Sequence, residues 1–147
     1  MPKQILLKFE RGGEVRATLL EDKAPKTCKV LLASLPVELK LIHAQWAGEE
    51  VFSDSFPVSS ELEVENEVNE MKGGEVGLIS ALVHRHLPRK GFLPFCIFYG
   101  IGRARKSVDE TTEVNVCAKI DDVEKMASIG RRIRAQGIEA VRITPAT

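Results

Sequence analysis

The sequence predicts a single α+β domain that is mainly β and carries two helices. Three observations lead to this prediction. Short segments in which apolar and polar residues alternate recur along most of the chain, which is the pattern of half-buried strands. Two segments, 24–35 and 121–136, have helical periodicity instead. The 147 residues are close to the commonest domain size and contain no linker, repeat or low-complexity tract, so we expect residues 1–147 to form one domain.

The predicted strands are short and are separated by turn residues. In chain order they are Gln4–Phe9, Glu14–Leu20, Val37–Trp46, Glu49–Phe52, Glu75–Val83, Phe95–Tyr99, Glu113–Ile120 and Glu139–Ile143. Gly12 and Gly13 lie between the first two strands and suit a tight hairpin turn. Gly48 interrupts the third and fourth strands, which predicts a second hairpin. From residue 53 to 74 the chain is polar and rich in glutamate, so we expect a solvated loop or strand edge there.

The two helices have recognisable starts and stops. The early helix, over 24–35, carries Pro25 in its first turn and ends before Pro36. The late helix, over 121–136, begins with an aspartate N-cap at Asp121, has Glu124 in the capping-box position, and stops at Gly137. Its expected apolar stripe is Val123, Met126, Ala127, Gly130 and Ile133. Its late arginines, Arg131, Arg132 and Arg134, are expected to complement the helix dipole and to need no ligand.

Composition excludes several classes of function. Lysine plus arginine balance aspartate plus glutamate at 21 each, so the broad positive field of a nucleic-acid-binding protein is absent. The chain has no apolar signal core and no apolar run near the length of a membrane span, which predicts a soluble cytoplasmic protein without membrane contact. Cys28, Cys96 and Cys117 are widely spaced in apolar sequence, as expected for buried reduced thiols.

Several motifs resemble cyclophilins. Glu21-Asp22-Lys23-Ala24-Pro25-Lys26-Thr27 resembles the point where a cyclophilin strand delivers an acidic residue and Ala-Pro-x-Thr starts the first helix, and Phe98-Tyr99-Gly100 is similar to the family's Phe-Gly strand end. The resemblance is closer to small prokaryotic cyclophilin-like domains of unknown function. It is carried by His43–Glu49, Glu65-Asn66, Gly74–Gly77, Phe98–Gly100 and Val114–Ile120. The resemblance implies a closed β-barrel with two capping helices, in agreement with the order of strands and helices.

The prolyl isomerase motif of cyclophilins is absent. In that family an arginine holds the prolyl carbonyl beside an aromatic-lined pocket, but this chain has no arginine between Arg16 and Arg85. It also lacks the Trp-Leu-Asn or Trp-Leu-Asp stretch before Phe-Gly. We therefore expect the fold without isomerase activity, because a fold is retained more readily than its site. A divergent isomerase is the alternative, and whether any reaction is catalysed stays open.

Six residues are candidates for a ligand site at the mouth of the barrel: His43, Gln45, Trp46, Glu49, Tyr99 and Arg103. They combine an imidazole, an amide, two flat aromatic walls, a carboxylate and a guanidinium, a set that suits a small polar or anionic metabolite. Strand alternation places His43 and Gln45 on one face and Trp46 on the other, without deciding which face lines the interior. The alternatives are that Trp46 fills the core, that His43 is a bystander and that Arg103 lies in a solvated turn.

Other motifs indicate no metal and no cofactor. His84 and His86 have a metal-ligand spacing, but no nearby cysteine, aspartate or glutamate completes a set, so an exposed basic loop is the better interpretation. Gly100–Lys106 lacks the ending of a phosphate-binding loop and no helix follows it. The rival function is a protein-interaction or assembly scaffold, in which a strand edge or the acidic 53–70 segment meets a partner or a second copy of the chain in a homo-oligomer.

Overall fold

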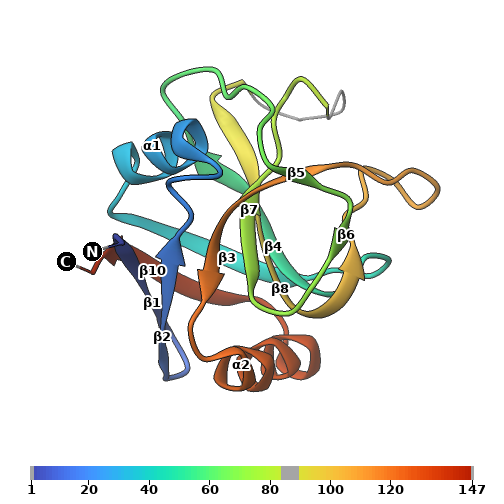
Figure 1. The fold of residues 1–147 in the computed structure, drawn as a ribbon. Helices are drawn as coiled ribbons and strands as arrows, with labels where there is room; N and C mark the ends of the chain where they lie inside the picture. Colours follow the sequence, from blue (N-terminus) through green and yellow to red (C-terminus); the bar gives the residue numbers. More distant parts are fainter. Residues whose placement is uncertain (1, 84–89, 147) are drawn as a thin grey trace.

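The structure, a computed structural model, describes residues 2–83 and 90–146. Its strands are β1 (Gln4–Phe9), β2 (Glu14–Leu19), β3 (Val37–His43), β4 (Gly48–Pro57), β5 (Glu67–Val68), β6 (Glu70–Met71), β7 (Glu75–Leu78), β8 (Phe92–Arg103), β9 (Val114–Ile120) and β10 (Glu139–Pro145). Its helices are α1 (Pro25–Ala33) and α2 (Val123–Gln136). Figure 1 shows α1 towards one end of the barrel and α2 at the other.

Eight of these strands form a closed antiparallel barrel. Around the barrel they run in the order β2-β1-β10-β3-β4-β8-β7-β9, and β9 returns to β2 through pairs such as Ala17 with Ile120. The short strands β5 and β6 add to β9 and β8 at the margin. The predicted fold class, a small mainly β barrel with two helices, is therefore confirmed.

Strand β8 shows how the barrel is filled. Phe95, Ile97 and Tyr99 point inward and join the main apolar core, whereas Cys96 and Phe98 point outward and join a second buried cluster. The second cluster exists because the segments that flank β8 fold back over its outer surface, burying residues 93–99 on both faces. Since apolar side chains pack the interior, any ligand site is to be sought outside the barrel.

The acidic segment after residue 53 is more structured than predicted. Its first residues continue β4 to Pro57, and β5 and β6 lie within it. Glu65 reaches helix α1, where its Oε1 accepts a hydrogen bond of 2.5 Å from the backbone N–H of Thr27. This carboxylate satisfies an N-terminal donor of a helix whose own cap residue, Ala24, has no capping side chain. The amide of Asn115 donates to Thr27 Oγ1 at 3.2 Å and to the carbonyl of Glu63 at 2.8 Å.

Other predicted boundaries also shift. Strand β3 ends at His43 rather than Trp46, because the chain turns there before Gly48, whose φ is +94°. Strand β7 ends at Leu78 rather than Val83, and β8 is longer than Phe95–Tyr99 at both ends. The basic pair His84 and His86 lies outside the described residues.

Helix α2 is confirmed, but its cap was assigned one residue too early. The N-cap is Asp122, whose side chain accepts from the backbone N–H of Lys125 at 3.1 Å, so Glu124 is not in the capping-box position. Asp121 instead accepts from Thr18 and Gln4, at 2.7 and 2.8 Å, which ties the end of β9 to the first hairpin.

The buried stripe of α2 differs in part from the prediction. It consists of Met126, Ile129, Gly130 and Ile133, while Val123 and Ala127 are only half-buried. Gly130 is required by close packing, because a Cβ there would lie 2.2 Å from the ring of Tyr99. The helix thereby closes one end of the barrel against β3, β4 and β8.

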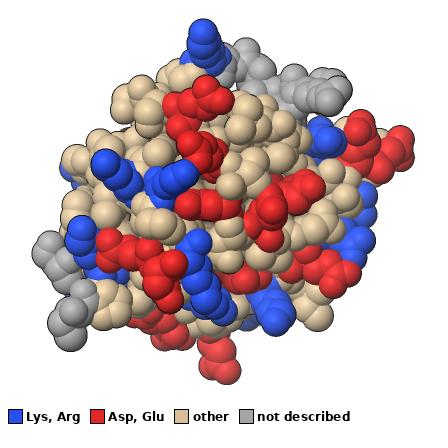
Figure 2. All heavy atoms as spheres, turned by 45° about the horizontal axis from the view of Figure 1, so that its top comes forward, with Lys and Arg blue, Asp and Glu red and all other residues tan. Residues whose placement is uncertain are grey.

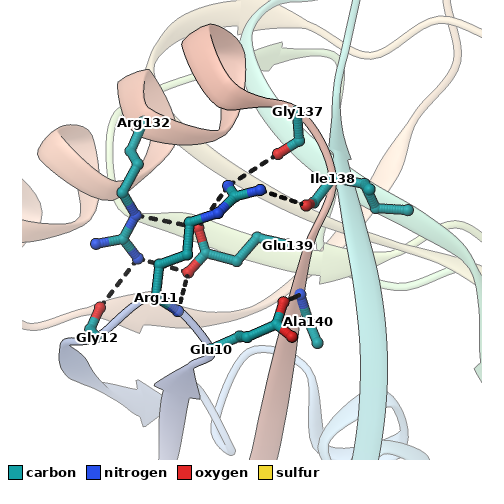
Figure 3. Close-up of polar contacts among 8 residues, drawn as sticks. All are labelled: Glu10, Arg11, Gly12, Arg132, Gly137, Ile138, Glu139 and Ala140. Atoms are coloured by element: carbon teal, nitrogen blue, oxygen red, sulfur yellow. Dashed lines mark hydrogen bonds and ion pairs between the residues drawn. The ribbon is translucent and has the colours of Figure 1, made fainter.

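Arg132 has a fixed partner within the chain in addition to the helix dipole. Figure 3 shows its guanidinium beside Glu139 of β10, with Nε donating to Oε1 at 3.0 Å and Nη2 to Oε2 at 2.6 Å. Arg11 adds its backbone N–H at 3.0 Å and a side-chain contact at 3.2 Å to the same carboxylate. Glu139 is 1% exposed, and a buried charge persists only when it is paired and hydrogen-bonded. This cluster fastens α2 to the first hairpin.

Candidate functional site

A cavity of about 350 Å³ lies on the outer surface of the barrel where β3, β4 and β8 meet the loop that follows β8. Strand alternation turns Glu50, Phe52 and Cys96 away from the filled interior and into this space. The lining residues are Ile42, His43, Ala44, Gln45, Trp46, Ala47, Glu50, Phe52, Asp54, Ile79, Pro94, Cys96, Arg105, Lys106 and Ser107. The site therefore combines apolar walls with ionisable groups of both signs.

The acidic side of the cavity is built by β4. Glu50 is 5% exposed, and its burial, together with the negative charge of Asp54, raises its pKa to about 7, although a hydrogen bond with Cys96 lowers it. Burial and the charge of Glu50 keep the pKa of the Cys96 thiol well above its usual value, so this cysteine stays protonated. The Glu50 carboxyl can therefore exchange a proton near neutral pH, and the thiol is no nucleophile.

The basic side comes from the loop after β8. Arg105 donates from Nε to the carbonyl of Trp46 at 2.8 Å and from Nη1 to the carbonyl of Val108 at 3.3 Å. Lys106 lies 3.9 Å from Glu110, with its side chain 23% exposed. The two cations enter the cavity from backbone that other hydrogen bonds hold in place, including Thr112 N–H to the carbonyl of Ala104 at 2.9 Å.

His43 stands at the edge of this cavity with both ring nitrogens engaged. Nδ1 lies 2.7 Å from the carbonyl of Ala44 and must donate to it, so in the neutral ring Nε2 accepts from the hydroxyl of Tyr99, also at 2.7 Å. Burial raises the pKa of Tyr99, and the charge of Glu49 raises it further, while Arg134 and Arg131 of helix α2 lower it. The phenol therefore stays protonated and orients the imidazole.

The structure divides the six predicted residues into two groups. His43, Gln45 and Trp46 line the cavity, with Trp46 55% exposed rather than packed in the core. Glu49, Tyr99 and Arg103 do not line it. Glu49 accepts from the backbone N–H of Ile101 at 3.1 Å, Tyr99 is buried under α2, and Arg103 forms an ion pair with Glu70.

Sequence reasoning missed Glu50, Cys96, Arg105 and Lys106. For the glutamate, the sequence is ambiguous: two adjacent glutamates follow Gly48, and only the phase of the strand decides which one faces the cavity. Arg105 and Lys106 lie beyond the end of β8, in a loop whose course alternation does not predict.

Outside this cavity, the described residues show neither a metal-ligand cluster nor a broad patch of one charge on the face drawn in Figure 2. In residues 2–83 and 90–146 no three histidine, cysteine, aspartate or glutamate side chains gather as a metal site would require. Figure 2 shows acidic and basic side chains interspersed over the visible face, as the balanced composition predicts. Within the described part of the chain, no helix is both long enough and apolar enough to cross a membrane.

Comparison with solved structures supports the assignment of the fold. The structure of McbB in complex with tryptophan superposes with a TM-score of 0.72 at 17% identity, over 97% of this chain and 44% of that one. The hypothetical protein AF2241 from Archaeoglobus fulgidus gives 0.60 at 23%, over 99% and 95%. The Mimivirus cyclophilin gives 0.49 at 11%, over 97% and 86%. The chain spans less than half of McbB, and at such identities the similarities to McbB and AF2241 establish the fold alone.

Comparison with protein-family models assigns the chain to a family. No curated protein matches it. A family model described as "Protein of unknown function (DUF3830)" matches residues 8–145. The expected membership of a family of unknown function is thus confirmed, and since the match covers almost every residue, this chain belongs to the DUF3830 family.

Proposed function

We propose that the protein binds a small anionic molecule, such as a carboxylate, in the outer cavity beside β4 and β8. The observation that carries the proposal is the pairing of a cavity of about 350 Å³ with two loop cations, Arg105 and Lys106, on one of its walls. That volume is at the lower end of the range for small-molecule sites. A guanidinium has five N–H donors, and in the described structure Arg105 uses Nε for the carbonyl of Trp46 in the β3–β4 turn and Nη1 for the carbonyl of Val108 in its own loop.

Preorganisation of the loop favours binding. Arg105 and Thr111 form an isolated antiparallel β-bridge, and the backbone N–H of Lys106 donates to the carbonyl of Glu110 at 3.0 Å. Glu110 N–H in turn donates to Ser107 Oγ at 3.2 Å. A ligand that meets cations already held in this way loses less free energy to ordering of the site.

The test is a thermal-shift and calorimetric screen of small carboxylates against wild type and two arginine variants. We expect saturable stabilisation by at least one carboxylate but not by its neutral amide. Arg105→Ala should weaken binding about tenfold or more, which corresponds to about 1.4 kcal/mol. The matched control is Arg103→Ala, two residues away with the same loss of charge, because Arg103 pairs with Glu70 outside the cavity. Equal losses in both variants would contradict the proposal, since they would indicate a general charge effect.

A second proposal, an assembly scaffold, is favoured by apolar side chains exposed around the same loop. Trp46, Ile101 and Val108 are 55, 82 and 53% exposed, and the backbone N–H of Arg103 joins their turns through the carbonyl of Ala47 at 2.8 Å. Large apolar side chains exposed close together are typical of interaction sites, and Arg105 joins the turn of Trp46 to the loop of Val108 by bonds to both carbonyls. The molar mass measured by light scattering should then exceed that of the monomer and fall to it in Trp46→Ser. A monomer at all concentrations would contradict self-assembly.

A further inference from the structure

We infer that the ligand of the outer cavity is a zwitterion with an apolar body, whose ammonium group binds at Glu50 and whose anionic group binds at Arg105 and Lys106. This inference rests on the proposed function and adds a second charge to the ligand class. It follows from three observations on the cavity wall: a buried carboxyl that has no ion pair with any described residue, cations on a different element, and apolar side chains in the same lining.

The first observation is that burial of the Glu50 carboxyl costs free energy. A carboxyl that is 5% exposed loses most of its hydration, and such burial is tolerated when the charge is paired or neutralised. Among the described residues no ion pair involves Glu50, and the hydrogen-bonding group that lowers its pKa is the thiol of Cys96, a weak donor. The raised pKa of Glu50, about 7, means that a bound proton partly replaces a missing counter-ion.

The second observation is that the cations of the cavity do not act as the counter-ion of Glu50. Arg105 and Lys106 belong to the loop after β8 and contact Trp46, Val108 and Glu110. Within the described residues neither cation forms an ion pair with Glu50, and Lys106 forms one with Glu110 instead, at 3.9 Å. In the described part of the chain the cavity therefore presents a buried acid without an ion pair and separate cations, which is the charge pattern complementary to a zwitterion.

The third observation concerns the body of the ligand. Phe52, Ile79 and Pro94 contribute apolar surface to the lining, and Trp46 stands at its exposed edge. A purely hydrophilic zwitterion would leave these walls in contact with water, whereas an aryl or alkyl group would cover them. An α-amino acid with an apolar side chain has all three features, and we take it as the probe class.

Three matched probes separate the two charges: phenylalanine, 3-phenylpropanoate, which lacks the amine, and 2-phenylethylamine, which lacks the carboxylate. Wild type is expected to bind phenylalanine about tenfold more tightly than 3-phenylpropanoate. In Glu50→Gln this preference should fall below about threefold, with affinity for 3-phenylpropanoate unchanged. Glu49→Gln is the control, since that neighbouring carboxylate lies outside the cavity and contacts Ile101.

Proton linkage gives a second readout. The titratable and charged groups that line the cavity with Glu50 are His43, Asp54, Cys96, Arg105 and Lys106. Binding of an ammonium group at Glu50 should release a proton near pH 7, seen as buffer-dependent binding heat, and the release should vanish in Glu50→Gln.

The outcomes distinguish the inference from the proposed function. Equal binding of phenylalanine and 3-phenylpropanoate, or a preference that survives in Glu50→Gln, would overturn the zwitterion and leave the anion site standing. Binding of 2-phenylethylamine as tightly as phenylalanine would overturn the anion site itself. If no probe binds, both are overturned for this ligand class.

Discussion

Replacing Arg132 by alanine should destabilise the protein by about 3 kcal/mol, far more than an ordinary surface arginine would. The variant loses both bonds to Glu139 and the bond from Nη2 to the carbonyl of Gly12 at 2.9 Å. Breaking a buried ion pair costs about 3–5 kcal/mol because one charge is left uncompensated. We expect the lower end, since Arg11 still contacts the Glu139 carboxylate and the Arg132 side chain is already 23% exposed.

The assay is urea unfolding, in which the midpoint should fall while the slope stays the same. Arg131→Ala is the matched control, because this neighbouring arginine is exposed, and its effect should stay within about 0.5 kcal/mol. A loss below about 1 kcal/mol in Arg132→Ala, or equal losses in the two variants, would refute the reasoning, since the cluster would then be no stronger than a surface ion pair.

The pH dependence of this loss gives an independent check. Burial raises the pKa of Glu139, but the hydrogen bonds from Arg132 and from the backbone of Arg11, with the two positive charges, lower it below the ordinary 4.5. A group whose folded-state pKa is lowered stabilises the fold above its unfolded pKa and loses that contribution as pH falls. The gap between wild type and Arg132→Ala should therefore be widest near neutral pH and narrow in acid. A gap independent of pH would indicate lost packing instead of lost charge.

Three further predictions test the packing, the cavity and the missing motif. Gly130→Ala should destabilise by about 1–3 kcal/mol through overpacking against Tyr99, and stabilisation of the kind helix propensity gives would refute that contact. Glu50→Gln should unfold at a higher temperature than wild type above pH 7, with a gain in stability on the order of 3 kcal/mol that disappears in acid. The reason is that a carboxyl with a raised folded-state pKa destabilises the fold as the pH rises through that pKa. A stability difference that is the same at every pH would contradict this. A coupled-protease assay on an Ala-Pro peptide should show no acceleration of cis–trans isomerisation, and turnover within about tenfold of a cyclophilin would contradict the interpretation of the absent arginine.

The order of strands and helices was predictable because it depends on local periodicity. Alternation located β1, β2 and β9 to within a residue or two, and α2 combines an apolar stripe with a stop at Gly137. The errors occur where a tertiary contact decides between adjacent residues. Asp121 and Asp122 are equally good caps in sequence, but Asp121 is used by Thr18 and Gln4, which leaves Asp122 to cap.

The site was half predictable for a related reason. His43, Gln45 and Trp46 are neighbours in sequence, so one turn brings all three to the cavity. Which glutamate faces the cavity depends on the phase of strand β4. A shift of one residue exchanges Glu49 for Glu50 and moves the carboxyl to the other face of the sheet. The break before Gly48 removes the phase information that β3 could have supplied, so only the folded sheet identifies Glu50.

The residues that carry the family resemblance serve different purposes, and this decides where function should be sought. Asn66 has a φ of +43°, tolerated well by asparagine, and its amide donates to the carbonyl of Val116 at 2.8 Å. With Glu65 and Asn115 it fastens the acidic segment to α1 and β9, so these motif residues are explained by the fold. The cavity residues are not explained in this way, because a buried Glu50 is a cost to the fold. Substitutions at Glu50 and in the loop after β8 should therefore alter the proposed binding of zwitterions while leaving the barrel intact.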